Sequence, residues 1–290
     1  MTRTAPHLVG LIGWPVEHSV SPAMHNAAFV RLGLHWRYLL LPAAPGGVGA
    51  VVNGLRQAPY RGANVTVPHK QAVIDHLDSI SATARGIGAV NTIVAQDGRL
   101  AGHNTDADGF LATLREAGFD PAGCRALVLG AGGAARSVVY ALASEAGHVT
   151  LYNRTRFRAE RLVEDVGRMN LPGAVTWLAG ETGLAGSDMG AFDLLVNATS
   201  VGMWPDRDAS PWPDKLAMPA HWTVFDLVYN PAETRLLAQA RASGATAIGR
   251  LSMLVHQGAL AFELWTGRTA PLDTMHAAAR AALRARTEGE

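Results

Sequence analysis

The sequence has almost none of the features that mark secreted, membrane or nucleic-acid-binding proteins. Its one cysteine, Cys124, cannot form a disulfide within the chain, which favours a reducing compartment and predicts a cytoplasmic protein. No apolar run approaches the roughly 20 residues of a membrane-spanning helix. The apolar residues 8–13 are too few for a signal peptide and predict a first strand. With a net charge of +1 and no basic runs, we expect no nucleic-acid partner. The scattered histidines have no metal-ligand spacing, so we expect no metal.

Lysine is also scarce, because the chain holds only Lys70 and Lys215 among its 25 Lys and Arg residues. An arginine keeps its proton at any workable pH, whereas a lysine can be tuned by burial and by its neighbours. Lys70 ends a run that begins at Asn64, and further amide side chains and Asp106 follow it along the chain. This order predicts hydrogen-bonding groups and a proton-transfer pair around a polyhydroxylated substrate. A surface lysine at the start of a helix is the alternative.

Length and composition predict a globular chain with two domains, since 290 residues of which 48% are apolar and 17% charged can fill two medium-sized cores. Strands and helices alternate, which predicts an α/β fold with a largely parallel sheet covered on both faces. We expect strands at 8–12, 38–41, 62–65, 89–94, 126–129, 149–152, 193–196, 223–227 and 245–248. The helices expected between them include 22–32, 48–57, 134–145 and 156–166. Residues 201–220, rich in Pro, Trp and Asp, predict a long loop that is either functional or disordered.

A glycine loop stands directly after an apolar strand and directly before a helix, and it consists of Gly130, Ala131, Gly132, Gly133 and Ala134. In this context the first glycine makes the turn and the second lets the backbone approach a pyrophosphate. The helix N-terminus then offers free N–H groups and a positive dipole. The order of strand, loop and helix predicts a dinucleotide site, with a tight turn that binds no ligand as the alternative.

The next strand of this unit indicates which dinucleotide is bound. A fold that prefers NAD usually ends this strand with an acidic residue, whereas a basic residue accommodates the 2′-phosphate of NADP. Here the strand is followed by Asn153, Arg154 and Thr155, with Arg158 one helical turn beyond Arg154. Two guanidinium groups can flank a phosphate with charge-assisted hydrogen bonds. The sequence therefore favours NADP, although solvated arginines at a helix start remain the alternative because Arg156 lies between them.

Two serines near the N-terminus, Ser19 and Ser21, stand two residues apart. In an extended segment their hydroxyls face the same side, so both can donate to one carboxylate. Ser21 precedes Pro22, which also predicts that Ser21 is the N-cap of a helix with proline at its first position.

These motifs together make the chain resemble the NADP-dependent shikimate dehydrogenase family from end to end. The matching runs are His18–Pro22, Asn64–Lys70, Gly88–Thr92, Asn104–Asp106, Gly130–Arg136, Asn153–Thr155, Asn197–Ser200 with Gly202 and Met203, Asp226–Pro231, and Met253–Gln257. The resemblance implies reversible NADPH-dependent reduction of 3-dehydroshikimate to shikimate in aromatic amino-acid biosynthesis. It also implies a substrate-binding catalytic domain of residues 1–105 completed by C-terminal helices in 250–290, a Rossmann domain of residues 106–249, and an active site in the cleft between them.

The resemblance also implies roles for individual residues. Lys70 and Asp106 are the expected catalytic pair, in which the ammonium group protonates the carbonyl oxygen and the aspartate orients it; Asp108 competes for the carboxylate role. Expected substrate-binding residues are Ser19, Ser21, Asn64, Thr66, Asn91, Tyr229 and Gln257. The expected cofactor-binding residues are Gly130, Ala131, Gly132, Gly133, Ala134, Asn153, Arg154, Thr155, Arg158, Thr199, Ser200, Leu227, Gly249 and Met253.

One departure from the family pattern lies at Gly249 and Arg250, where the family commonly has Asp-Gly. Either the glycine has moved by one position or Arg250 replaces it, which leaves open the backbone contact to the nicotinamide. Two other functions remain possible at this point. One is an NAD-dependent quinate/shikimate dehydrogenase, and the other is a ligand-sensing regulator that has lost turnover. Shikimate and NADP are the expected partners, and the chain is expected to be a monomer or a homodimer.

Overall fold

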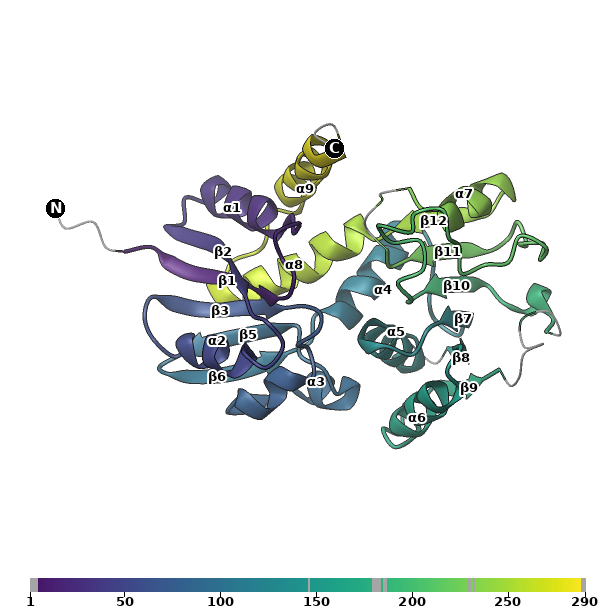
Figure 1. The fold of residues 1–290 in the computed structure, drawn as a ribbon, viewed down its shortest axis with the longest axis horizontal. Coiled ribbons are helices and arrows are strands. Elements are labelled where there is room, and N and C mark those ends of the chain that lie inside the picture. Colours follow the sequence, from purple (N-terminus) through teal and green to yellow (C-terminus); the bar gives the residue numbers. More distant parts are fainter. Residues whose placement is uncertain are drawn as a thin grey trace. The chain divides into compact units, whose positions relative to one another are not determined.

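A computed structural model describes residues 5–145, 147–178, 184, 187–228, 231 and 233–287 of the chain. The chain forms two compact units, each with its own sheet (Figure 1). Unit 1 consists of Met1–Gly109 and Leu254–Glu290, and unit 2 consists of Phe110–Met253. The expected domain boundaries, after residues 105 and 249, lie within a few residues of these.

The sheet of unit 1 is mixed. Its strands are β1 (His7–Gly13), β2 (Trp36–Pro42), β3 (Tyr60–Val65), β4 (Ser79–Ile80), β5 (Thr92–Gln96) and β6 (Arg99–His103). They follow the order β2-β1-β3-β5-β6-β4, and β5 runs antiparallel to both of its neighbours. The sheet is otherwise parallel, which agrees with the predicted largely parallel sheet. Asp97 and Gly98, both with positive φ, form the tight turn that lets β6 return beside β5.

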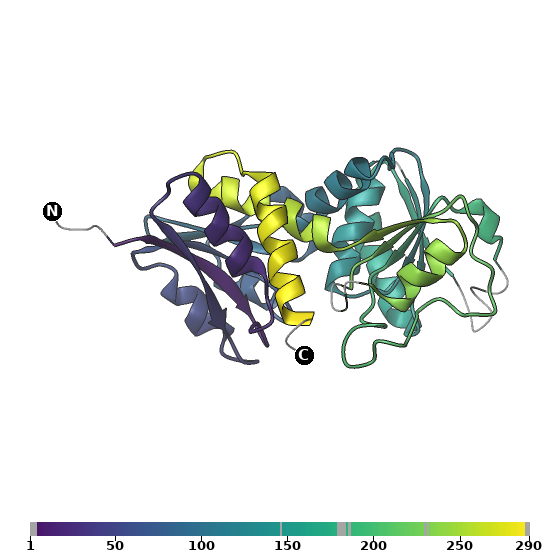
Figure 2. The same cartoon turned by 90° about the horizontal axis from the view of Figure 1, so that it is seen from above.

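The helices of unit 1 pack around this sheet. They are α1 (Ser21–Arg31), α2 (Val48–Gly54), the 3-10 helix η1 (Ala72–His76), α3 (Ala82–Ile87) and α9 (Leu272–Thr287). Two further helices, α4 (Asp106–Glu116) and α8 (Leu251–Thr266), have one end in each unit. Figure 2 shows α9 lying along α1, which places the last helix of the chain beside the first.

Two expected elements of unit 1 have other bounds. The strand expected at 89–94 begins only at Thr92, because Val90 donates its N–H to the carbonyl of Lys70 outside the ladder. The helix expected at 48–57 ends at Gly54. The first difference places Val90, which bonds to the Lys70 backbone, in a loop before β5.

Unit 2 is a parallel sheet with the strand order of a Rossmann fold. Its strands are β7 (Arg125–Leu129), β8 (His148–Tyr152), β9 (Ala174–Trp177), β10 (Leu194–Asn197), β11 (Thr223–Asp226) and β12 (Thr246–Gly249). They follow the order β9-β8-β7-β10-β11-β12, in which each pairing is parallel. This is the doubly wound order of dinucleotide-binding sheets and confirms the predicted Rossmann domain. The helices are α5 (Gly133–Ser144), α6 (Arg156–Gly167), α7 (Arg235–Ala242) and the 3-10 helix η2 (Met189–Ala191).

The long segment 201–220 is neither helix nor strand, as expected, but it is packed. Trp212 is 2% exposed and lies edge-on to Trp222, with ring centroids 5.2 Å apart. Met218 belongs to the same apolar cluster of unit 2. The apolar side chains of residues 201–220 therefore hold this segment against unit 2. Among the described helices of the whole chain, none combines the length and the apolar character needed to cross a membrane.

Candidate active site

Lys70 and Asp106 form a mostly buried ion pair in unit 1. The Lys70 Nζ donates to Asp106 Oδ2 at 2.6 Å, and the side chains are 14% and 6% exposed. Asp106 is the first residue of α4, where the helix dipole favours a negative charge. The competing carboxylate, Asp108, is exposed. An ammonium group carries three protons, so two of them remain for other acceptors after the bond to Asp106.

A cluster of buried polar side chains adjoins this pair through the backbone at residues 104–106. Asn91 accepts from the Thr105 backbone N–H at 2.8 Å through its Oδ1. Its Nδ2 donates to Gln257 Oε1 at 3.2 Å and to the Thr105 hydroxyl at 3.0 Å. Asn91 is 2% and Gln257 is 9% exposed. Residues 166 positions apart in the chain thus place their amide groups together.

Asn64 lies near the end of β3 and is also buried, with 5% exposure. Its Nδ2 donates to the Thr92 hydroxyl at 3.1 Å and to the Asn91 carbonyl at 3.3 Å, which ties it to the same cluster. Its Oδ1 accepts from the Tyr38 hydroxyl at 2.9 Å. Thr66, two residues further on, is half-buried and donates its backbone N–H to Ile12 O.

The hydroxyls of Ser19 and Ser21 lie together, as predicted, but for a different reason. Ser19 Oγ donates to Ser21 Oγ at 3.1 Å and accepts from the Ser21 backbone N–H at 3.2 Å. The chain turns here instead of being extended, and α1 already begins at Ser21. The N-cap position is Val20, with no capping side chain, so the predicted cap by Ser21 was wrong. The Ser21 hydroxyl is therefore available for other contacts.

Tyr38, which was not among the predicted site residues, contacts one of these groups. It is 2% exposed, and its hydroxyl donates to Asn64 Oδ1. Burial raises the pKa of this phenol above its usual range. The available signal was a tyrosine amid Leu residues in a predicted strand, since a buried tyrosine hydroxyl usually finds a polar partner.

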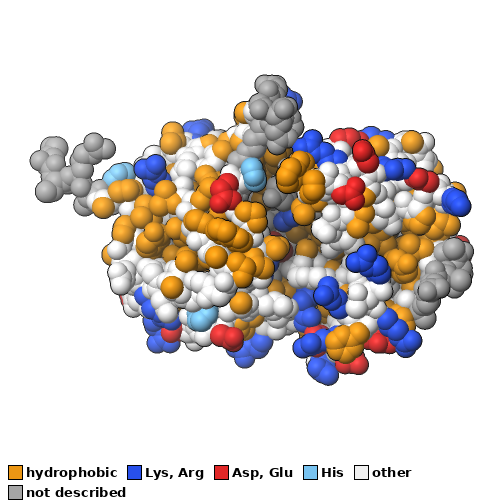
Figure 3. All heavy atoms as spheres, in the orientation of Figure 1, with side chains coloured by type: hydrophobic (Ala, Val, Ile, Leu, Met, Phe, Trp, Pro, Cys, Tyr) orange, Lys and Arg blue, Asp and Glu red, His pale blue; other side chains and the backbone are white. Residues whose placement is uncertain are grey.

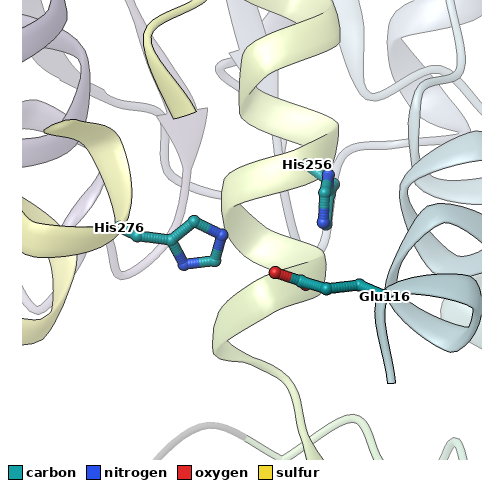
Figure 4. Close-up of side chains that lie close together, drawn as sticks. All are labelled: Glu116, His256 and His276. Atoms are coloured by element: carbon teal, nitrogen blue, oxygen red, sulfur yellow. The ribbon is translucent and has the colours of Figure 1, made fainter. Parts of the chain in front are cut away.

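Two histidines of unit 1 lie close together. Figure 4 shows His256 on α8 and His276 on α9, and their rings meet edge to face with centroids 5.9 Å apart. Figure 4 also labels Glu116, which ends α4 in unit 2. The expectation that the chain needs no metal stays a prediction.

In unit 2, the glycine loop lies where the sequence predicted it, between β7 and α5. Gly130 has a φ of +109°, and a side chain there would lie 2.9 Å from the Ala198 carbonyl oxygen, so only glycine fits. Gly132 and Gly133, in contrast, have open space where a Cβ would stand. No side chain caps α5, whose first N–H groups follow directly after Ala131. An uncapped helix start beside an open glycine backbone fits a bound pyrophosphate.

The start of α6 fits the 2′-phosphate of NADP. Figure 3 shows Lys and Arg side chains gathered over this helix on the face that it draws. Arg156 is engaged elsewhere, because it binds Glu160 at 2.7 Å and lies 4.7 Å over the Trp177 ring. Arg154 and Arg158 are exposed, and no ion pair among the described residues involves them. Thr155 is the N-cap of α6 but its hydroxyl makes no capping bond. The Asn153 side chain donates to Thr155 O at 2.7 Å, which fixes this turn.

The ends of β10, β11 and β12 carry the remaining expected cofactor residues. Thr199 is bound through its N–H and hydroxyl to Asn197 Oδ1, and Ser200 beside it is exposed. The Leu227 N–H donates to Asn197 O at 3.0 Å. Gly249 ends β12, and Met253 is buried on α8, the same helix as Gln257. Tyr229 lies outside the described residues.

Arg250, which departs from the family pattern, bonds to the backbone of a neighbouring strand end. Its Nη1 donates to the Leu227 carbonyl at 3.1 Å, so the guanidinium group occupies a backbone acceptor that was expected to face the cofactor. Nearby Asp226 is fully buried and hydrogen-bonded to Asn197 and Thr234. Burial raises the pKa of Asp226. The sequence alone did not show that Arg250 bonds this turn.

A buried lysine and carboxylate next to clustered amides, with a separate Rossmann sheet whose loop fits NADP, define the chain as an NADP-linked oxidoreductase of a small polar substrate. Two family models match it. Residues 11–93 match the shikimate dehydrogenase substrate binding domain, and residues 251–280 match the shikimate 5′-dehydrogenase C-terminal domain.

Similar proteins extend the match over the whole chain. A shikimate dehydrogenase (NADP(+)) of Moorella thermoacetica is 50% identical over 99% of this chain and 97% of its own length. One of Symbiobacterium thermophilum, with the same name, is 46% identical over 97% and 96%. Among solved structures, the match includes the shikimate 5-dehydrogenase of Thermus thermophilus, crystallised in complex with NADP(H) and shikimate. Its sequence is 42% identical to this chain, and the two structures superpose with a TM-score of 0.86. The match covers 95% of this chain and 99% of that chain.

The chain therefore belongs to the shikimate dehydrogenase family. The predicted resemblance is confirmed, as is the oxidoreductase class. Because these relatives are named for NADP(+), the NAD-dependent quinate/shikimate dehydrogenase is not favoured. The non-catalytic regulator is not favoured either.

Proposed function

We propose that, as a member of this family, the chain catalyses the reversible NADPH-linked reduction of 3-dehydroshikimate to shikimate, with Lys70 and Asp106 as its catalytic pair. The observation that carries the proposal is the 2.6 Å contact between Lys70 Nζ and Asp106 Oδ2 inside a buried polar cluster. NADPH supplies the hydride to the carbonyl carbon. The protein then has to stabilise the charge on the carbonyl oxygen and provide the proton.

Lys70 is suited to both tasks. Its ammonium group keeps two protons for acceptors other than Asp106, and one of these can be transferred to the carbonyl oxygen as negative charge builds there. Asp106 holds the ammonium group in place from the first turn of α4. In the oxidation of shikimate the neutral amine accepts the same proton back.

The substrate's polar groups find complementary partners in unit 1. Ser19 and Ser21 supply hydroxyl donors for a carboxylate, because a carboxylate only accepts hydrogen bonds. Thr66 and Tyr229 are expected to complete this anchor. Asn64, Asn91 and Gln257 supply amide groups for the ring hydroxyls. Site residues that are themselves fixed by hydrogen bonds discriminate strongly against substrates that lack a matching hydroxyl.

The cofactor is bound by unit 2 through its backbone and its arginines. The open backbone at Gly132 and Gly133, with the start of α5, fits the pyrophosphate. Arg154, Arg158 and the Thr155 hydroxyl can bind the 2′-phosphate with charge-assisted bonds. We further expect a cytoplasmic protein, which its single cysteine favours, and either a monomer or a homodimer.

Replacing Lys70 tests the catalytic assignment. We expect Lys70→Ala to lower kcat by roughly two to four orders of magnitude, the usual range for a positioned acid-base group. Lys70→Arg should also be nearly inactive, because a guanidinium group keeps the charge but does not release its proton. Shikimate binding should persist in both variants. The measurements are steady-state rates with shikimate and NADP and, separately, shikimate binding by calorimetry.

The chain supplies a matched control in its other lysine, Lys215, which is exposed in the 201–220 segment. Lys215→Ala should keep the parental kcat. A melting curve for each variant separates loss of chemistry from loss of fold, since removing Lys70 leaves Asp106 buried without its partner. A folded Lys70→Ala enzyme with a rate within tenfold of the parent would remove Lys70 from the mechanism.

A further inference from the structure

Tyr38 stands between the two groups of side chains that are expected to bind opposite ends of the substrate. Its hydroxyl donates to Asn64 Oδ1 at 2.9 Å, and its backbone is paired with Asn26 of α1, the helix that begins at Ser21. Ser21 belongs to the carboxylate anchor and Asn64 to the amide cluster. Tyr38 therefore lies between the helix of the anchor and the amide cluster.

The Tyr38 hydroxyl has a single proton, and Asn64 Oδ1 accepts it. Asn64 donates its Nδ2 to Thr92 Oγ1 and to the Asn91 carbonyl. The Asn64 amide is therefore fixed at both ends, with Oδ1 toward Tyr38 and Nδ2 toward the cluster.

Tyr38 itself is held on every side. Asn26 on α1 pairs with both backbone groups of Tyr38, accepting its N–H at 2.8 Å and donating to its carbonyl at 3.1 Å. β2 is an edge strand of its sheet. The Asn26 side chain therefore makes the backbone hydrogen bonds that a neighbouring strand would otherwise make. The His25 ring stacks on the Tyr38 ring, with centroids 4.4 Å apart and planes 2° from parallel. His25 and Asn26 both belong to α1, so one helix fixes the position of the phenol.

From this geometry we propose that Tyr38 is a positioning residue that is held by α1 and in turn holds the hydroxyl-binding amide of Asn64 in a fixed orientation. The inference rests on the proposed function, because it takes shikimate as the ligand. Tyr38 thus keeps Asn64 oriented with its Oδ1 toward the phenol, and the remaining lone pair of Oδ1 accepts a substrate hydroxyl.

The first test is Tyr38→Phe, which removes only the hydroxyl and keeps a ring that can stack on His25. KM for shikimate should rise about tenfold, because Asn64 Oδ1 loses the hydroxyl that donates to it and an unsatisfied buried acceptor weakens binding by about this factor. The change in kcat should be less than threefold. Tyr60→Phe is the matched control, because Tyr60 begins β3 in the same sheet and its hydroxyl has no part in the site. It should leave KM unchanged.

A double variant separates positioning from a merely structural role. If Tyr38 acts through Asn64, Tyr38→Phe together with Asn64→Ala should raise KM by less than the product of the two single effects. A multiplicative result, or an unchanged KM in the folded Tyr38→Phe enzyme, would overturn the inference. A parent enzyme that does not turn over shikimate with NADP would instead overturn the proposed function.

A second measurement keeps the inference testable if Tyr38→Phe does not fold. The parent chain, with its five tyrosines, can be labelled with 3-fluorotyrosine. Replacing each of the other four by phenylalanine assigns the fluorine resonance of Tyr38 by elimination. Shikimate added without cofactor should shift that resonance, because a substrate hydroxyl then shares Asn64 Oδ1 with the phenol, and should leave the resonance of Tyr60 in place. A Tyr38 resonance that does not respond to saturating shikimate contradicts the proposal.

Discussion

At the scale of single residues, unit 1 keeps a histidine neutral in its core. His25 is fully buried among aromatic rings, and neither of its ring nitrogens has a hydrogen-bond partner among the described residues. Burial lowers the pKa of His25 to about 3. Its charged form would have to be solvated by Tyr38, Phe262 and Trp265, which stack around it and offer no acceptor to the ring nitrogens.

This burial predicts acid lability. Between pH 6.5, the ordinary histidine pKa, and pH 3, the unfolded chain binds a proton at His25 that the folded chain does not, so the free energy of unfolding falls as pH falls. The slope from this one group approaches about 1.4 kcal/mol per pH unit, or about 2 kcal/mol between pH 7 and pH 5. Urea titrations of the parent and of His25→Phe over this range measure it.

The test compares how steeply the free energy of unfolding changes with pH in the two proteins. Their absolute free energies of unfolding are not compared, because the larger phenylalanine ring can itself strain the core. His25→Phe should flatten the dependence of the unfolding free energy on pH below 6.5. Other groups, such as half-buried His103, contribute equally to both proteins. If the free energy of unfolding depends on pH in the same way in parent and variant, then protonation of His25 does not destabilise the folded protein.

At the scale of elements, the position of Gln257 depends on how closely two helices approach within unit 1. A Cβ on Gly109 of α4 would lie 2.8 Å from the Gln257 backbone nitrogen and 3.0 Å from its Cα on α8. Backbone atoms cannot rotate away as a flexible side chain can. Only glycine at position 109 therefore lets Gln257 reach Asn91.

We expect Gly109→Ala to lower the free energy of unfolding by about 1 to 3 kcal/mol, the usual effect of overpacking, offset by up to about 1 kcal/mol of helix propensity. KM for shikimate should rise as well, since Gln257 is displaced. Gly54→Ala at the end of α2 is the control, because a Cβ there meets open space. Thermal melts and steady-state kinetics measure both effects. A Gly109→Ala enzyme with parental KM would mean that Gln257 does not bind substrate.

Elements with strong local signals were predictable from the sequence. The strand, glycine loop and helix around Gly130 follow from apolar runs and glycines alone, and the same holds for the first strand and α1. The antiparallel turn at Asp97 and Gly98 was missed, although an Asp-Gly pair between two apolar runs is a strong hairpin signal. The cap assignment failed at Ser21 because the helix begins one residue earlier than expected and Ser19 takes the bond to its amide.

Contacts between distant positions could not be predicted in the same way. The resemblance supplied Lys70 and Asp106 as a pair, 36 residues apart, and their contact depends on the return of the chain through β5 and β6. Tyr38 meets Asn64 only because β2 and β3 flank β1 in the sheet. Nothing in the sequence near residue 38 encodes that arrangement. Arg250 and the Leu227 carbonyl are likewise brought together by the neighbouring ends of β11 and β12.

At the scale of the whole molecule, the expected ligands divide between the two units. Apart from Tyr229, the predicted substrate-binding residues belong to unit 1, and the predicted cofactor-binding residues belong to unit 2. Ser19 and Arg154 are an instructive pair, because one is expected to bind the substrate carboxylate and the other the 2′-phosphate. Ser19 belongs to unit 1 and Arg154 to unit 2, and substitutions at independent sites usually give additive free energies.

Ser19→Ala should therefore raise KM for shikimate more than it lowers kcat, since the carboxylate contact is made in both ground and transition states. Arg154→Gln should lower kcat/KM for NADP by roughly tenfold, because a charge-assisted bond is weaker where the guanidinium is exposed to salt and water. It should affect NAD far less, since NAD lacks the 2′-phosphate. The double variant should show the product of the two effects, measured with each substrate varied in turn at fixed ionic strength.

Arg156→Gln is the matched control for the cofactor half of this test, because the Arg156 guanidinium group is already held by Glu160 and Trp177. It should keep the parental preference for NADP, whereas raised salt should reduce that preference in the parent, since an exposed phosphate contact is screened. Equal losses for NADP and NAD in Arg154→Gln would assign Arg154 to the fold of unit 2. If the effect of the double variant differs widely from the product of the two single effects, then binding of a ligand in one unit alters binding in the other. In that case the two ligands are not divided cleanly between the units.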